Sequence, residues 1–247
     1  MTRLCVLLPA LNEAEHIGDM VRRIRLILIP DTSVTVLVVN DGSTDETAKL
    51  AADAGAVVIS HSVNRGVGAA FRSGILYARK EGFDSLLHMD SDGQIAPEQI
   101  PKLLDPLLRG DEDLVLGSRF CGEFPANFKR WKVNALRALA GLLSFLTGSH
   151  LSDISCGFRA MNRMVLLELN PRFDYDYIQE SLLQALAARA RTVDVPVIVH
   201  YNVEPTGMSR RTLRYISRFL LIMASGLLYF YRRRILEAFG FRVRGAD

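Results

Sequence analysis

The chain has 247 residues, 49% of them hydrophobic and 23% charged, which is typical of a globular protein with one sizeable core. A formal net charge of only +3, without basic and aromatic residues in alternation, argues against a nucleic-acid partner. Three cysteines without metal-ligand spacing argue against a zinc site or a disulfide framework and favour a reducing, cytoplasmic setting.

Short apolar runs alternate with amphipathic helical patterns along the first half of the chain. We predict strands at residues 5–8, 34–39, 56–59, 86–89 and 114–116, and helices between them at residues 13–29, 45–54, 68–81 and 97–108. The second half is mainly helical in pattern, with one further strand predicted at residues 193–200. Strands that alternate with helices are typical of an α/β fold in which helices flank both faces of a mostly parallel sheet.

Polar motifs follow three of the predicted strands. The motif PALNE (residues 9–13) follows the first strand, NDGSTD (residues 40–45) the second and DSDGQ (residues 90–94) the fourth. Ligands of such sheets bind at the carboxyl ends of the strands, so we expect the three motifs to converge on one site.

The third of these motifs predicts a metal site. Asp90 and Asp92 alternate at a strand end, which can bring both carboxylates toward one point, and Gln94 adds an amide oxygen. Hard oxygen ligands of this kind suit Mg²⁺ or Mn²⁺. The alternative is a capping loop, since aspartate and serine often begin helices and Pro97 suits a first helical turn.

The second motif and the segment that follows it indicate nucleotide contacts. Asp41 stands at a strand tip, where it can accept hydrogen bonds from a base or a ribose hydroxyl, whereas Asp45 suits the capping of the next helix. The segment NRGVGAA (residues 64–70) lacks the spacing of known phosphate loops. It is either a tight turn into a helix or a loop that turns Arg65 or Arg72 toward a nucleotide.

Six ordered blocks resemble those of family 2 glycosyltransferases: PALNE, NDGSTD, NRGVGAAFRSG, MDSDGQ, GSR and SCGFR, within residues 4–199. Inside that family the chain is most similar to the dolichyl- or polyprenyl-phosphate mannose and glucose synthases. The order and spacing of all six blocks are more specific than any single block. The resemblance implies a Rossmann-like GT-A fold and metal-dependent, inverting transfer of mannose or glucose from a nucleotide diphosphate sugar.

The resemblance also implies a donor site. Its nucleotide-sugar-binding residues would be Pro9, Asn12, Glu13, Asp41, Arg65 and Asp90. Its Mg²⁺ or Mn²⁺ ion would be held by Asp90, Asp92 and Gln94. Such an ion stabilises the negative charge that develops on the departing nucleoside diphosphate.

On the acceptor side, the resemblance implies a polyprenyl phosphate. Arg119, in the GSR block, would meet the acceptor phosphate; the alternative is a surface arginine after a strand. Ser209 and Arg210 would also contact phosphate, because they match the end of the R-x-x-G-x-S-K block of the lipid-phosphate synthases. Glu204 replaces the first arginine of that block, which is a departure at the diphosphate clamp.

The kind of acceptor decides whether a general base is needed. A phosphate is already anionic and only has to be positioned, whereas a sugar hydroxyl must lose a proton. Asp153 and Glu180 are candidate bases, and Glu180 also lies near the place where related enzymes have an active-site acid. The alternatives are therefore a soluble family member that acts on a saccharide hydroxyl in cell-surface glycan synthesis, and a membrane-binding pseudoenzyme.

A basic tail, residues 207–247, follows the catalytic domain that we predict at residues 1–206. Nine arginines and one glutamate lie within residues 207–244, on either side of the apolar run at residues 219–231. That run is shorter than the roughly 20 residues of a spanning helix. A basic amphipathic helix suits an anionic membrane surface, and a buried helix or an oligomer contact is the alternative. We therefore expect a peripheral enzyme on the cytoplasmic face of the membrane.

Overall fold

The computed structural model describes residues 1–121, 130–174, 176–200 and 210–240. It contains one seven-stranded sheet in the order β3-β2-β1-β4-β6-β5-β7, which confirms the predicted α/β fold. The strands are β1 (Thr2–Ala10), β2 (Thr32–Asn40), β3 (Val57–Ser60), β4 (Ser85–His88), β5 (Leu114–Ser118), β6 (Arg159–Asn162) and β7 (Thr192–Pro196). Neighbouring strands run parallel except at β6, which is antiparallel to both β4 and β5.

Strand β6 is absent from the elements predicted above, because its four residues, RAMN, carry no alternating pattern. Its conformation depends on long-range pairing, in which Met161 lies opposite Leu86 of β4 and Leu114 of β5. An antiparallel strand begins at the edge of the sheet where its parallel neighbours end. The loop before β6 therefore lies at the edge of the sheet where β4 and β5 end, which is where the predicted site is expected.

The helices are α1 (Ile17–Leu26), α2 (Thr47–Asp53), α3 (Val67–Lys80), α4 (Ile100–Leu108), α5 (Arg130–Thr147), α6 (Arg163–Glu168), α7 (Tyr177–Ala187) and α8 (Arg210–Ala238), and a 3-10 turn, η1 (Pro97–Gln99), precedes α4. Helix α1 is shorter than the predicted helix at residues 13–29. Its first predicted residues form a turn in which the Glu13 oxygen accepts hydrogen bonds from the backbone of His16 and Ile17. This turn leaves the Glu13 side chain at the carboxyl end of β1.

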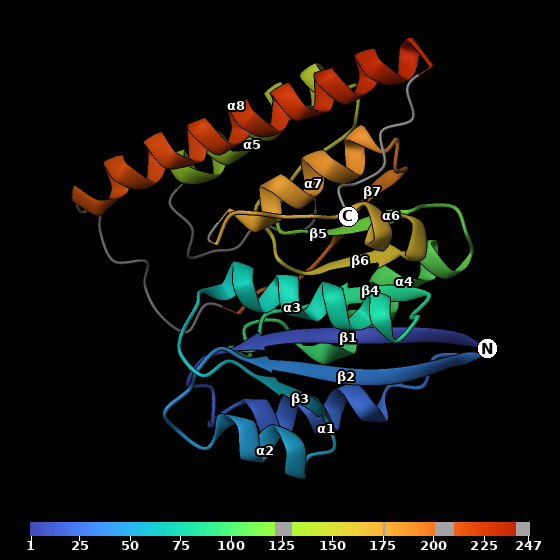
Figure 1. The fold of residues 1–247 in the computed structure, drawn as a ribbon, viewed down its shortest axis with the longest axis vertical. Coiled ribbons are helices and arrows are strands. Elements are labelled where there is room, and N and C mark those ends of the chain that lie inside the picture. The colour runs from blue at the N-terminus through green and yellow to red at the C-terminus, as the bar shows by residue number, and fades with distance from the viewer. Residues whose placement is uncertain (122–129, 175, 201–209, 241–247) are drawn as a thin grey trace.

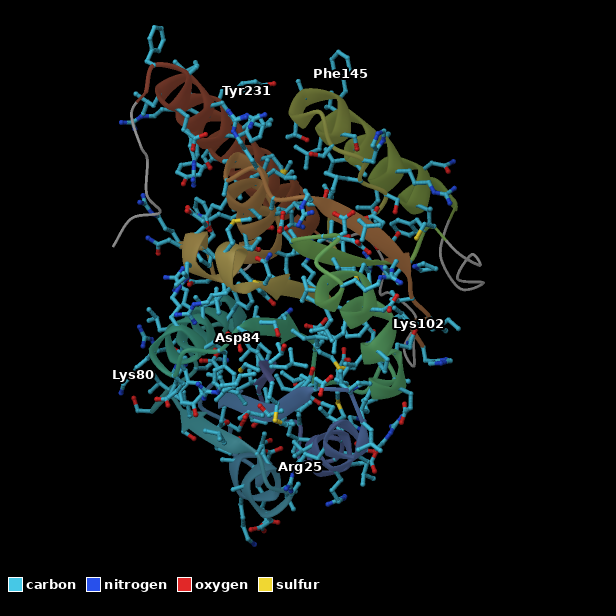
Figure 2. The ribbon with its side chains drawn as sticks, turned by 90° about the vertical axis from the view of Figure 1, so that its right-hand side faces the viewer. Arg25, Lys80, Asp84, Lys102, Phe145 and Tyr231 are labelled. Carbon is cyan, nitrogen blue, oxygen red and sulfur yellow. The ribbon has the colours of Figure 1, made fainter. Side chains whose placement is uncertain are left out.

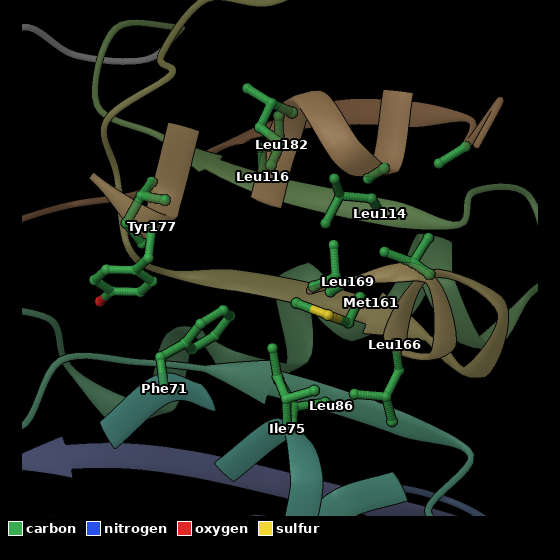
Figure 3. Close-up of a cluster of buried hydrophobic side chains, with 14 of the residues drawn as sticks. Phe71, Ile75, Leu86, Leu114, Leu116, Met161, Leu166, Leu169, Tyr177 and Leu182 are labelled. Carbon is green, nitrogen blue, oxygen red and sulfur yellow. The ribbon is translucent and has the colours of Figure 1, made fainter. Parts of the chain in front are cut away.

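Two apolar cores cover the two faces of the sheet. One lies under α1, α2 and α4, and the other lies under α3, α6 and α7. In Figure 1, α1 and α2 lie at one end of the molecule and α5 and α8 at the other. Figure 3 shows part of the second core, with these side chains labelled: Phe71, Ile75, Leu86, Leu114, Leu116, Met161, Leu166, Leu169, Tyr177 and Leu182.

The basic C-terminal helix α8 packs along α7. Met223 and Phe230 are buried there, and Gly226 approaches Leu183 so closely that a Cβ atom at position 226 would overlap the leucine. Arg233 is also buried and forms an ion pair with Glu168 of α6 (2.7 Å). One face of the predicted tail is therefore part of the protein core, while the predicted domain boundary at residues 206 and 207 lies outside the described residues. No helix in the described ranges has the length and apolar character needed to span a membrane.

Candidate active site

A cavity of about 310 Å³ opens at the carboxyl ends of β1, β2 and β4. It is lined by Pro9, Ala10, Leu11, Glu13, Asp41, Asn64, Gly66, Val67, Ala70, Asp90, Ser91 and Asp92. The three polar motifs predicted to converge thus meet at one place, as expected for a parallel sheet. Five of the predicted donor-site residues, Pro9, Glu13, Asp41, Asp90 and Asp92, line this cavity.

Four carboxylates line the cavity, those of Glu13, Asp41, Asp90 and Asp92, and they give it a negative charge. Asp90 is exposed, while Glu13 and Asp92 are half-buried. Burial raises the pKa of Asp92, and the charge of Asp90 raises it further. Burial likewise raises the pKa of Glu13, with a contribution from Asp92. Because these groups repel one another, a divalent cation between them would relieve an existing electrostatic strain.

The donor set fits a metal ion that is shared with a substrate. Among the described residues, no three histidine, cysteine, aspartate or glutamate side chains converge as a complete metal site. Asp90 and Asp92 would supply two ligands and leave the other positions to diphosphate oxygens and water, which is how Mg²⁺ is usually held. Gln94 donates its backbone N–H to Asp92 (3.0 Å), but its side chain does not line the cavity, so its role as a metal ligand stays a prediction.

Asp41 is held from within the protein. Its Oδ1 lies 2.6 Å from Nδ1 of His61 and accepts the N–H of Arg65 (2.9 Å), and its Oδ2 accepts the N–H of Gly66 (2.8 Å). The other ring nitrogen of His61 lies 2.9 Å from the hydroxyl of Ser73 on α3. Asp41 therefore fixes the loop that forms one wall of the cavity, and its contact with a base or ribose stays a prediction.

His61 is a site residue that the sequence motifs do not single out. The sequence does carry a signal, because His61 comes two residues after the third predicted strand, residues 56–59, and directly after β3 in the structure, where ligand-side residues are expected. Arg65 is exposed and its side chain does not line the cavity. Arg72 is paired with Asp174 (2.8 Å), so the structure gives it a partner other than a nucleotide.

Asn12 and Asp45 tie the first two motifs together. The Asn12 side chain accepts the N–H of Thr44 (2.9 Å), and the Asp45 carboxylate accepts the N–H groups of Thr47 (3.0 Å) and Ala14 (3.2 Å). Asp45 thus holds the turn that leads into α2, as predicted, although the N-cap residue of this helix is Glu46 rather than Ser43 or Thr44. Asn12 is exposed beside the cavity but does not line it, so its contact with a nucleobase stays a prediction.

Arg119 follows β5 and is fixed by a bidentate ion pair. Its Nε lies 2.6 Å from Oδ2 of Asp153 and its Nη2 lies 2.9 Å from Oδ1, while Ser155 accepts a further bond from Nη2 (2.5 Å). The Asp153 side chain is fully buried, and 15% of the Arg119 side chain is exposed. Asp153 therefore sets the plane of the guanidinium, and this bond pattern does not suit Asp153 to the role of a general base.

The Arg119–Asp153 pair should make the folding stability of the protein depend on pH. Burial alone would raise the pKa of Asp153, but the hydrogen bond and the charge of Arg119 outweigh burial and lower it. A lowered folded-state pKa means that the pair stabilises the fold above the ordinary pKa of aspartate and that this stabilisation is lost as the pH falls through the lowered value. The difference in Tm between the wild type and Asp153→Asn should therefore be largest near neutral pH and shrink in acid. A difference that stays constant down to about pH 3 would contradict this assignment.

Glu180 lies away from the donor cavity. It lines a separate cavity of about 320 Å³ between α7 and α8. Its Oε2 accepts the N–H groups of Arg172 (2.7 Å) and Phe173 (3.0 Å). The carboxylate thus holds the turn before α7, and the geometry does not support the predicted catalytic role. Ser209, Glu204 and the side chain of Arg210 lie outside the described residues.

The family model described as "Glycosyl transferase family 2" matches residues 5–169. The chain belongs to this family. The matched span contains the acidic cavity, Arg119 and the loop before β6. These three features therefore lie in the part of this glycosyltransferase that defines its family.

The chain is similar to two mannose-transferring enzymes. Polyprenol monophosphomannose synthase of Mycolicibacterium smegmatis is 35% identical over 175 residues, which cover 68% of this chain and 64% of that protein. Undecaprenyl-phosphate mannosyltransferase of Micrococcus luteus is 29% identical over 208 residues, which cover 79% of this chain and 82% of that protein. The glycosyltransferase thus spans less than two thirds of the length of the first of these relatives.

Solved structures share the fold. Glucosyl-3-phosphoglycerate synthase from Mycobacterium tuberculosis, in complex with Mn²⁺, UDP-glucose and phosphoglyceric acid, is 25% identical with a TM-score of 0.67. The match covers 92% of this chain and 80% of that chain. The same enzyme in complex with UDP is 26% identical with a TM-score of 0.68. These likenesses confirm the GT-A fold expected from the sequence blocks.

Proposed function

We propose that this glycosyltransferase moves a hexose, mannose or glucose, from a nucleotide diphosphate sugar to a polyprenyl phosphate at a membrane surface. The observation that carries the proposal is the placement of a fixed arginine, Arg119, at the same strand-end edge as an acidic donor cavity. A guanidinium held in one plane presents its positive charge to an acceptor phosphate at a fixed position. The activities of similar proteins, which include an undecaprenyl-phosphate mannosyltransferase, support the same acceptor class.

The side chains divide the chemistry between them. A Mg²⁺ or Mn²⁺ ion held by Asp90 and Asp92 would stabilise the negative charge of the leaving nucleoside diphosphate. Arg119 would orient the acceptor phosphate for attack on the anomeric carbon from the face opposite the leaving group, which inverts the configuration. The phosphate needs no general base, and this agrees with the engagement of both candidate bases, Asp153 and Glu180, by the protein itself.

An exposed apolar face supports the membrane part of the proposal. We call it the α5–α8 face, and it consists of Leu142, Phe145, Leu221, Leu228, Tyr231, Ile235 and Phe239. The Tyr231 hydroxyl donates to the Leu146 oxygen (2.7 Å), which joins the two helices. Figure 2 shows Phe145 and Tyr231 at the end of the molecule opposite Arg25. Arg232 is exposed on the same helix, at the cavity between α7 and α8, and adds a cationic group to α8. Apolar and cationic groups on one helix together favour binding to anionic membranes.

The α5–α8 face gives a test that leaves the core packing of α8 in place. The triple variant Phe145→Ser/Leu221→Ser/Leu228→Ser should bind anionic liposomes at least tenfold more weakly, because each side chain is more than half exposed and contributes more than 1 kcal/mol when buried in a membrane. Sedimentation with liposomes measures the change. Leu28→Ser is the matched control, since Leu28 is 93% exposed but lies just beyond α1, away from this face. Full sedimentation of the triple variant would instead favour an oligomer contact at this face.

The proposed reaction itself is tested with a donor panel. The purified protein is incubated with Mn²⁺, undecaprenyl or dolichyl phosphate, and GDP-mannose, UDP-glucose or UDP-GlcNAc, and lipid-linked sugar is measured. The proposal expects lipid-linked mannose or glucose from one of the first two donors, and none after chelation of the metal. Donor hydrolysis without lipid product would favour a hydroxyl acceptor, and the absence of both would favour the pseudoenzyme.

A further inference from the structure

Arg159, at the start of β6, is a buried arginine that binds backbone carbonyls. Its Nε donates to the Cys156 oxygen (2.9 Å) and its Nη2 to the Ile154 oxygen (3.0 Å). Its Nη1 donates to the Ile178 oxygen in the first turn of α7 (2.7 Å). One guanidinium thus joins the loop before β6 to the helix that packs beside it.

That loop, residues 153–157, touches both halves of the proposed site. At its start, Asp153 and Ser155 hold Arg119. At its end, Gly157 lies against Asp90, and a Cβ atom at position 157 would stand 3.0 Å from Oδ2 and 3.1 Å from Oδ1 of that carboxylate. A side chain at this position would press on the Asp90 carboxylate and shift it by a few tenths of an ångström.

A second buried side chain holds the end of the same loop. His88, the last residue of β4, has its Nδ1 2.5 Å from the Gly157 oxygen, so Nδ1 carries the proton. Nε2 can then accept from the hydroxyl of Tyr177 (3.3 Å). The loop is therefore fixed from β4 as well as from β6.

Placing an arginine in this position is energetically expensive. Burial lowers the pKa of Arg159, which means that the charged form is poorly solvated there, and well-packed apolar side chains often stabilise a core better than buried charges. What a guanidinium provides is several donors in one rigid plane, which can fix the spacing of carbonyls from two separate segments. The chemistry of the guanidinium therefore indicates that Arg159 positions the segments whose carbonyls it binds, rather than stabilising the core.

We propose that Arg159 is a positioning residue that sets the loop of residues 153–157 so that Arg119, on the acceptor side, is aligned with Asp90, on the donor side. The inference rests on the proposed function, because that function assigns the two sides. It also gives the SCGFR block a role that the resemblance to the family leaves open.

The test compares Arg159→Lys and Gly157→Ala with Arg79→Lys. Arg79 is a matched control, because its guanidinium also donates to backbone carbonyls, those of Leu166 and Leu169, but it joins α3 to α6 away from the cavity. Three quantities are measured: the Kd of GDP or UDP with Mn²⁺ by calorimetry, the KM for polyprenyl phosphate, and Tm. We expect both loop variants to raise the Kd and the KM by about tenfold or more, as loss of an outer-shell contact does. Arg79→Lys should lower only Tm.

Two results would overturn the inference. The first is an Arg159→Lys variant that is folded and less stable but has wild-type Kd and KM, since this is the behaviour of a merely structural residue. The second, which serves even if Arg159→Lys does not fold, is a Gly157→Ala variant in which only one of the two constants changes. A wild type that makes no lipid-linked sugar would count against the proposed function instead, and the calorimetric measurement would still show whether the loop sets the donor side.

Discussion

Replacing Asp92 with asparagine is expected to abolish sugar transfer, with kcat/KM lower by about 10³-fold or more. In the proposed mechanism, the variant removes one negative ligand of the metal that would stabilise the leaving diphosphate, an effect of several kcal/mol in the transition state. The fold should survive, because the bond that Asp92 Oδ1 accepts from the Gln94 N–H can be kept by the asparagine oxygen.

The stability of the metal-free protein provides an internal check on Asp92→Asn. Since burial raises the pKa of Asp92 in the folded state, ionising this group costs folding free energy at neutral pH. Asparagine removes that cost, so the Tm of the variant should equal or slightly exceed that of the wild type. A drop in both activity and Tm would mean that Asp92 serves the fold rather than the metal.

Asp84→Asn is the matched control for this experiment. Asp84 precedes β4 and Asp92 follows it, so the two lie beyond opposite ends of the strand. Like Asp92, Asp84 accepts a backbone N–H, that of Arg3 (2.8 Å). The control should transfer sugar normally. Near-normal turnover in Asp92→Asn would refute the metal assignment, whatever the control does.

Loss of Arg119 is expected to damage the acceptor step by about 10²-fold or more, while the affinity for GDP or UDP with Mn²⁺ changes little. The paired bonds to Asp153 hold the positive charge of Arg119 in one place, and the ammonium group of an Arg119→Lys variant would keep the charge but lose these paired bonds. The lysine variant should therefore recover only part of the activity that Arg119→Ala loses. Calorimetry measures the affinity for the nucleotide, and the rate of lipid-linked sugar formation measures transfer to the acceptor, so the two effects can be separated.

The structure adds a complication to the alanine variant. Arg119→Ala would leave the carboxylate of Asp153 buried without its ion-pair partner, which typically costs about 3–5 kcal/mol of stability. The double variant Arg119→Ala/Asp153→Asn removes both charges and so separates loss of the anchor from loss of the fold. It should be more stable than Arg119→Ala and equally poor in transfer.

Arg191→Ala is the control for the arginine variants. Arg191 forms the same bidentate pair with Asp113, with Nε and Nη2 each 3.0 Å from a carboxylate oxygen, but at the start of β5 rather than at its end. Its loss should leave transfer unchanged. If Arg119→Lys and Arg119→Ala both transfer normally to polyprenyl phosphate, Arg119 is not the acceptor anchor.

The sheet and the donor cavity could be predicted because their signals are local. The buried parallel strands are apolar runs, and the residues that line the cavity directly follow those runs, so topology alone brings Glu13, Asp41, Asp90 and Asp92 together. The same reasoning cannot find β6, whose four residues become a strand only by pairing with β4 and β5.

Long-range contacts account for the other differences. The sequence shows that Asp153 and Glu180 are acidic, but not that one binds Arg119 and the other the backbone of residues 172–173. The apolar run in the C-terminal segment predicts a helix, but its pattern does not say which face α7 covers. The buried partners of Arg159 are backbone carbonyls, which leave no trace in the sequence.

The most direct test of the account compares two acceptors that differ only in their phosphate. With the donor that the panel selects and with Mn²⁺, the protein is given a polyprenyl phosphate or the unphosphorylated polyprenol of the same length, and the sugar attached to lipid is measured for each. We predict transfer to the phosphate and none to the alcohol, because Arg119 would bind the phosphate whereas the hydroxyl would need a base. Equal transfer to both lipids, or transfer to a saccharide hydroxyl with no product on polyprenyl phosphate, would contradict it.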